Sequence, residues 1–211
     1  MHRVREDGEV VHTDMSHHVG FGTTISPFCY IESNVVIGEH CTIGVGTVIG
    51  TDPQHAIKQP PFGGVVIGNH VRIREHCTIH AALEPGDVTT IGDRCYLMAG
   101  THVGHDCCIE DDVILASPKL AGHTHVMCNA NVGLGAVTHQ YTVIGTGAMV
   151  GCGAVVVKDI PPYMKVAGNP VQDLGENHYL ASKVTAEFIE AETARFHALR
   201  VLVGKRGTRC L

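Results

Sequence analysis

The stretch IGDRCYLMAGTHVGHDCCI, residues 91–109, carries the pattern that decides the fold of this 211-residue chain. Its aliphatic residues Ile91, Leu97, Val103 and Ile109 stand six positions apart, and a small or β-branched residue comes two positions before each of the last three. A spacing of two points both side chains to the same side of a strand. The rest of each unit often begins with Gly, which suits a sharp corner. Each unit therefore predicts one short strand and one corner.

The count of six continues on both sides of this stretch. The aliphatic or β-branched positions are Val19, Ile25, Ile31, Ile37, Ile43, Ile49, Ile67, Ile73, Ile79, Leu115, Leu120, Val126, Val132, Thr138, Ile144, Val150 and Val156, with one five-residue unit between Leu115 and Leu120. A period of six matches neither an α-helix nor a simple hairpin sheet. Three units close a triangular coil of eighteen residues, whose strands pair with those of the next coil. We therefore predict an all-β solenoid, a parallel β-helix.

Two segments rich in Pro and Gly interrupt the repeat, residues 50–66 and 81–90, and are predicted to be loops. Ile49 to Ile67 and Ile73 to Ile91 each span eighteen positions, so we count each interrupted stretch as one coil. That count places Thr51, Asn69, Asp87 and His105 in one column, with His123 and then Tyr141 and nearby His139 below, shifted by about one place. Both loops are therefore expected to overhang His105, where a rigid scaffold commonly carries its site.

The chain is predicted to divide into a β-helix domain, residues 1–170, and a C-terminal helical extension, residues 171–211. From about Asn177 to Val203 the composition changes to Ala, Glu, Arg and Leu with apolar residues at helical spacing. We expect one helix there, which caps the open end of the solenoid or packs on a neighbouring subunit.

Composition excludes several classes of protein. With 44% hydrophobic and 17% charged residues, the chain can bury a core and is not expected to be disordered. Aromatic residues make up 5%, Trp is absent, and the formal charge is −6, which argues against nucleic-acid binding. No apolar run reaches the ~20 residues of a membrane span, and the polar start is unlike a signal peptide. We therefore expect a soluble, cytoplasmic protein.

The cysteines and histidines call for separate explanations. None of the nine Cys forms a C-x-x-C pair, so no disulfide framework or zinc ribbon is indicated. Five occupy the small inward position of the repeat and are predicted to be core side chains: Cys29, Cys41, Cys77, Cys95 and Cys107. Of the sixteen His, we single out His102, His105, His123 and His139, which gather on one column.

His105 is followed by Asp106, and a histidine beside a carboxylate is suited to proton abstraction near neutral pH. Gly122, one coil below, offers an unhindered backbone N–H that could face a developing oxyanion.

The ordered series THVGHDC (101–107), LAGH (120–123) and VTHQY (137–141), followed by DIPPY (159–163), resembles the left-handed β-helix acyltransferases. Within these it is similar to the family that acylates UDP-N-acetylglucosamine at the start of lipid A biosynthesis, over roughly residues 25–170. The resemblance implies a left-handed helix, a homotrimer with sites between neighbouring subunits, and transfer from an acyl thioester on acyl carrier protein or CoA. It implies no metal and no cofactor.

Matching positions imply the roles of individual residues. His105 corresponds to the general base, Asp106 to the residue that orients it, and Gly122 to the oxyanion donor. The acceptor and the thioester arm would be held by His102, His123, His139, Gln140, Gln54, Lys58 and His80.

Both loops depart from the family. The family's N-Q-D-L-K run reads DPQHAIK at 52–58, and Ala81-Ala82 replace Arg-Gly after His80. A related enzyme that acylates a different, possibly amino, sugar therefore remains open. Two other classes also remain: a zinc enzyme like the γ-carbonic anhydrases, using His80, His102 and His105, and a solenoid without catalytic activity.

Overall fold

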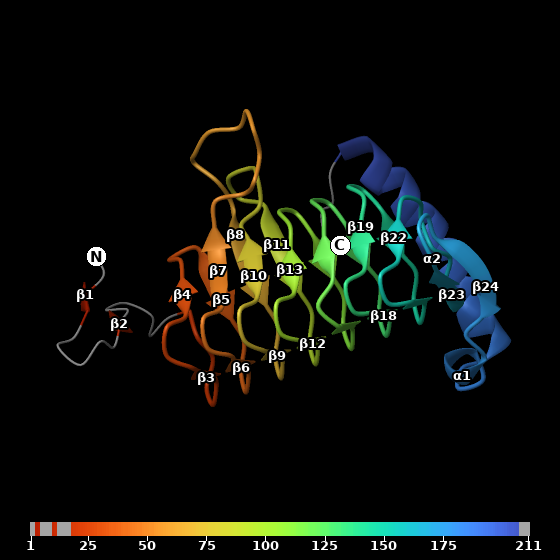
Figure 1. Ribbon diagram of the computed structural model, residues 1–211, viewed down its shortest axis with the longest axis horizontal. Helices are drawn as coiled ribbons and strands as arrows, with labels where there is room; N and C mark the ends of the chain where they lie inside the picture. The colour runs from red at the N-terminus through yellow and green to blue at the C-terminus, as the bar shows by residue number, and fades with distance from the viewer. Residues whose placement is uncertain (1–2, 5–9, 12–17, 207–211) are drawn as a thin grey trace.

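The computed structural model describes residues 3–4, 10–11 and 18–206, and residues 18–167 wind into a parallel β-helix (Figure 1), whose last strand pairs antiparallel with residues 172–176. The predicted domain limits at residues 1 and 211 lie outside the described residues. Every third strand pairs with the next coil, so the three sides of the triangle form three sheets. The predicted solenoid is confirmed.

The strands are short, as the repeat requires. Sheet 1 contains β4 (Tyr30–Ile31), β7 (Val48–Thr51), β10 (Thr78–His80), β13 (His102–Val103), β16 (Lys119–Leu120), β19 (Val137–Thr138) and β22 (Val155–Val156). Sheet 2 contains β5 (Val35–Ile37), β8 (Gly64–Ile67), β11 (Val88–Ile91), β14 (Cys108–Ile109), β17 (His125–Val126) and β20 (Val143–Ile144). Sheet 3 contains β3 (Thr24–Ile25), β6 (Thr42–Ile43), β9 (Arg72–Ile73), β12 (Tyr96–Leu97), β15 (Ile114–Leu115), β18 (Asn131–Val132), β21 (Met149–Val150), β23 (Met164–Ala167) and β24 (Gln172–Glu176). Outside them, β1 (Arg3–Val4) pairs with β2 (Val10–Val11).

The core is the stack of inward side chains that the repeat predicts. Ile49, Leu97 and Val126 are completely buried, and the other inward aliphatic residues from Ile31 to Val156 lie in the same cluster. The five inward cysteines belong to this cluster as free thiols, and burial raises the pKa of the Cys107 thiol to about 12. Their prediction as core side chains is confirmed.

The two interruptions are insertions, and counting them as single coils is wrong. Ile49 pairs with Ile79, thirty positions on, and Ile67 pairs with Ile91, twenty-four positions on. Ile49 and Ile67 therefore lie in different sheets, and Asn69 lies at another corner from His105, where its backbone N–H donates to Asp93. Inserted residues bulge outward without advancing the strands, so a count of residues cannot reveal the register across them.

Beyond the coils the described chain forms two helices, α1 (His178–Ala181) and α2 (Ala186–Arg206), where one was expected. Helix α2 lies along sheet 2 of its own solenoid rather than across the open end (Figure 1). Its buried residues Phe196, Leu199 and Val203 recur at helical spacing and pack on Met127 and Val143. No helix in the described part of the chain is long and apolar enough to span a membrane.

A buried carboxylate attaches α2 to the coils. Glu110 accepts hydrogen bonds from His125 Nε2, at 2.6 Å, from the Cys128 backbone N–H and from Arg195 of α2. Burial alone would raise the pKa of Glu110, but the hydrogen bonds from His125 and Arg195 outweigh it and lower the pKa to about 2. The carboxylate therefore stays charged and holds the Arg195 guanidinium and the His125 ring.

We predict that Glu110→Gln lowers the free energy of unfolding by about 3 kcal/mol at pH 7, because it removes one partner of a largely buried ion pair. Since the folded-state pKa is depressed, this stabilisation is complete above the unfolded value of ~4.3 and is lost as pH falls toward 2. Urea unfolding at pH 7 and pH 3 measures it. The control is Glu75→Gln, which removes an exposed pair with Arg74 and should change nothing measurable. Equal free energies of unfolding for the two variants at pH 7 contradict this role of Glu110.

Candidate functional site

The candidate site lies at the corner between sheets 1 and 2. Here the chain turns from β13 to β14 through His105 and Asp106, and the same corner carries residues 52–63 and 81–87 in the two coils above. The predicted overhang of both loops above His105 is therefore confirmed, although the count that suggested it is wrong.

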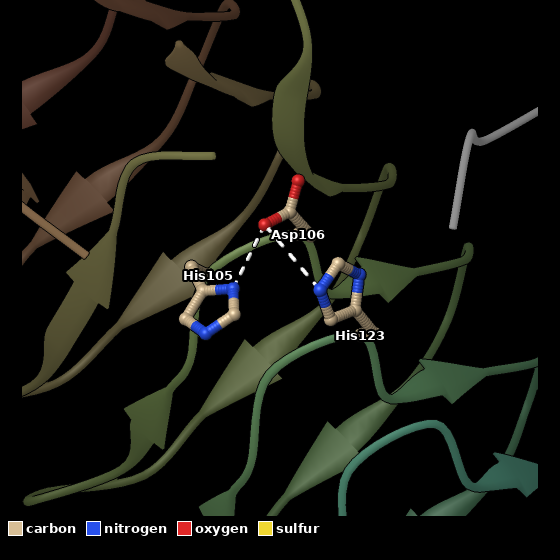
Figure 2. A group of neighbouring side chains, drawn as sticks. All are labelled: His105, Asp106 and His123. Carbon is tan, nitrogen blue, oxygen red and sulfur yellow. Dashed lines mark hydrogen bonds and ion pairs between the residues drawn. The ribbon is translucent and has the colours of Figure 1, made fainter. Parts of the chain in front are cut away.

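His105 and Asp106 form a buried pair. The ring nitrogen Nδ1 lies 2.8 Å from Asp106 Oδ2, and the two residues are 8% and 6% exposed (Figure 2). Because an ionised carboxylate can only accept hydrogen bonds, Nδ1 carries the proton and the lone pair is left on Nε2. His105 is therefore arranged to accept a proton at Nε2, as a general base must.

The five-residue unit decides what lies beneath this pair. It sets the coils seventeen residues apart here, as the pairing of Val103 with Leu120 shows, so Gly122 follows below His105 and His123 below Asp106. Asp106, His123 and Tyr141 occupy the same corner position in three successive coils, with φ angles of 57°, 60° and 62°.

His123 lies between a carboxylate and an aromatic ring. Its Nε2 is 3.9 Å from Asp106 Oδ2, so Asp106 faces two imidazoles (Figure 2). The His123 ring also stacks on the Tyr141 ring, with centroids 4.4 Å apart and an interplanar angle of 7°. Burial lowers the pKa of His123, and the attraction to Asp106 offsets this in part. His123 is thus neutral near pH 7 and can donate or accept a hydrogen bond.

Gly122 lets the base pack directly on the backbone. A Cβ atom at this position would lie 2.4 Å from Cε1 and 2.6 Å from Nε2 of His105, far inside contact distance. The structure thus brings Gly122 under His105, as predicted, and gives the glycine a steric reason as well.

His80 and His102 lie on the sheet 1 side of the corner. Their rings meet edge to face at 5.0 Å, and His102 Nδ1 is 2.7 Å from the Thr78 hydroxyl. Burial, then repulsion from Lys119 and from His80 when His80 is protonated, lower the pKa of His102 to about 4. Burial also lowers the pKa of His80. Within the described chain, the buried Nδ1 of His80 has no hydrogen-bond partner. Both rings are therefore neutral at pH 7.

A cavity of about 370 Å³ opens beside His105 under the loop after β7. Its lining residues are Gln54, His55, Ala56, Ile57, Leu83, His105, His123, Gln140 and Tyr141. Three predicted binding residues, Gln54, His123 and Gln140, thus come together with the base. Lys58 does not line the cavity, because its Nζ pairs with both oxygens of Glu84 at 2.7 and 2.8 Å. His80 and His102 are not among its lining residues, and His139 is exposed.

Sequence reasoning missed His55 and Leu83 as site residues, and it placed Tyr141 on the column without assigning it a role. His55 meets His105 edge to face at 6.3 Å. The signal for Tyr141 is its spacing of eighteen from His123, which places its ring on the next coil. No comparable spacing marks His55 or Leu83, since both lie in insertions.

Among the described residues, the group whose ligand atoms lie close enough to hold a metal ion is His105, Asp106 and His123, within 4.8 Å of one another. The trio required for the zinc enzyme, His80, His102 and His105, is not gathered at that distance.

Comparison with known proteins shows the class to which the chain belongs. The bacterial transferase hexapeptide family (six repeats) matches residues 16–51. The acyl-(acyl-carrier-protein)–UDP-N-acetylglucosamine O-acyltransferase of Gloeothece citriformis is 43% identical over 141 residues, 66% of this chain and 51% of that protein. The protein of the same name from Synechocystis sp. is 40% identical over 172 residues, covering 80% and 62%. The chain thus spans about half to three fifths of these relatives.

The crystal structure of the UDP-N-acetylglucosamine acyltransferase of Arabidopsis matches with a TM-score of 0.69 and 30% identity, covering 92% of this chain and 75% of that one. The coils and the corner histidines place the chain among the left-handed β-helix transferases built from hexapeptide repeats. Within that class, the chain belongs to the family of UDP-N-acetylglucosamine O-acyltransferases.

We predict that Gly122→Ala displaces the His105 ring while the coils stay folded, because the added methyl group and the ring cannot share the space. A crystal structure of the variant and the circular dichroism spectrum measure the two effects. The control is Gly86→Ala, also in a corner loop, where a Cβ would meet nothing within 4 Å, although its φ of 87° costs some stability. An undisturbed ring in Gly122→Ala contradicts the packing described above.

Proposed function

We propose that this protein transfers an acyl group from an acyl thioester to a hydroxyl group of a nucleotide-linked amino sugar such as UDP-N-acetylglucosamine. The observation that carries the proposal is the contact of His105 Nδ1 with Asp106, which leaves Nε2 to accept a proton, beside a cavity lined by both polar and apolar side chains. The names of the relatives supply the substrate class, with acyl carrier protein as the donor's carrier. CoA is the alternative carrier, and a different sugar, or an amine as acceptor, is the alternative substrate.

The proposed reaction needs one base and one oxyanion donor. His105 Nε2 takes the proton of the acceptor hydroxyl as its oxygen attacks the thioester carbonyl carbon, and Asp106 stabilises the resulting imidazolium. The tetrahedral oxyanion accepts a hydrogen bond from the Gly122 N–H, a type of contact worth ~3 kcal/mol in the barrier. When the carbon–sulfur bond breaks, the thiolate takes the proton back from Nε2. The charges balance within these groups, so the reaction as written uses no bound cofactor.

The remaining predicted residues divide by position. Gln54, His123 and Gln140 in the cavity would hold the acceptor. His80 and His102, on the sheet 1 side, would face the thioester arm. We also propose a homotrimer, in which a neighbouring subunit would cover the sheet 1 side, whose outer face includes the exposed side chains of Tyr30 and Val137. A second copy fits such an apolar face, and light scattering of the purified protein measures the assembly.

We predict that His105→Ala lowers kcat by at least 100-fold while the fold and assembly are kept, because the side chain lies outside the core cluster. Asp106→Ala should lower it less, since it only orients and stabilises the base. The assay is a mass-spectrometric screen of acyl carrier protein and CoA thioesters against UDP-sugars, read for the acylated product. The control is His70→Ala, which removes an exposed imidazole stacked on His40 at another corner. Turnover of His105→Ala near that of the wild type, or no product from any pair, overturns the proposal.

A further inference from the structure

Asp106 is held by three separate contacts. Its Oδ2 accepts hydrogen bonds from His105 Nδ1, at 2.8 Å, and from the backbone N–H of Leu83, at 3.1 Å. Its own backbone N–H donates to the hydroxyl oxygen of Thr89, at 2.8 Å. Leu83 and Thr89 both belong to the coil above, so that coil sets the position of the carboxylate.

The backbone of Asp106 needs such support. Its φ of 57° lies in the left-handed region, which residues with a Cβ adopt at a cost. The residue is also 6% exposed, and a buried N–H without a partner would cost roughly 1–3 kcal/mol. A partner for this N–H therefore helps to fix the turn that aims the carboxylate at His105.

Thr89 is suited to this role by chemistry rather than by packing. It is completely buried in β11, immediately after residues 81–87, at an inward position of sheet 2. The paired residue in the coil above is Val65, also completely buried, so the core accepts valine at this level. What distinguishes Thr89 is an oxygen within hydrogen-bond distance of the catalytic corner.

We infer that Thr89 is a positioning residue for the His105–Asp106 pair: its hydroxyl oxygen fixes the Asp106 backbone, so that the carboxylate meets His105 Nδ1 and keeps the lone pair on Nε2. This inference rests on the proposed function for its effect on turnover. Its structural part, the state of the His105 ring, stands apart from any activity.

Several other ionisable groups face His105. His123 approaches from the coil below, and His55 from the loop above, with ring centroids at 5.1 and 6.3 Å. His80 and His102 on sheet 1 interact with it electrostatically. In the described part of the chain, none of these four histidines forms a hydrogen bond with Thr89. A change at Thr89 therefore reaches His105 through Asp106.

The experiment compares Thr89→Val, which removes the hydroxyl at nearly constant volume, with Thr89→Ser, which keeps it. In Thr89→Val we expect kcat to fall about 10-fold with both KM values unchanged, and Thr89→Ser to restore most of it. In the absence of substrates, ¹⁵N NMR of the imidazoles should show that His105 of the wild type and of Thr89→Ser carries its proton on Nδ1. In Thr89→Val the signals should move toward a mixture of the two tautomers.

The matched control is Thr47→Val. Thr47 is also completely buried, and its hydroxyl oxygen accepts the backbone N–H of Cys77 in the next coil, away from the corner. We expect Thr47→Val and Thr89→Val both to lower the melting temperature. Thr47→Val should leave kcat and the NMR signals of His105 unchanged. If Thr89→Val does not fold, Thr89→Ala carries the same comparison.

Wild-type kcat and wild-type His105 signals in folded Thr89→Val overturn the inference, as does an equal loss of kcat in Thr47→Val. If the wild type transfers no acyl group at all, the proposed function fails, and the NMR comparison still decides the role of Thr89.

Discussion

The hydrogen bonds between successive coils are the constraint on which the candidate site depends. They fix which corner residue lies beneath which: the His123 N–H donates to the His105 carbonyl at 2.9 Å, and the Tyr141 N–H donates to the Gly122 carbonyl at 3.3 Å. Since the coils have no freedom to slide, one omitted residue between Leu115 and Leu120 decides that a glycine, and not a histidine, lies under the base. The pairing register of the backbone therefore decides which residues meet at the site.

The same constraint explains how much of the molecule could be predicted from its sequence. The repeat gives the coils, the core and the inward cysteines, because each side chain's direction follows from its place in the unit. It also brings His105, Asp106 and Gly122 together, since no insertion separates their coils. The repeat fails across residues 52–63 and 81–87, where the length of an insertion carries no information about register. For this reason the count of eighteen placed Asn69 in the wrong column and gave no signal for His55.

The position of α2 could not be predicted for a different reason. Its sequence shows that a helix forms, but the face of the solenoid that it covers is selected by contacts distant in the chain. Arg195 reaches Glu110, Arg200 reaches Asp159, and Phe196 packs beside Met127 and Val143. Partly exposed charge pairs of this kind add little to net stability, but they favour this docking position of the helix over others. Glu110 is therefore better understood as fixing where α2 lies than as strengthening the fold.

The site combines parts that differ in their freedom to change. His105, Asp106, Gly122 and Thr89 are held by the coils, and an altered residue there disturbs the core or the base itself. Gln54 and Lys58 lie in an insertion that leaves the strand register intact whatever its sequence. In this insertion Lys58 pairs with Glu84 and does not line the cavity. A chain built in this way can change the molecule that it accepts while it keeps the base, and so the chemistry, unchanged.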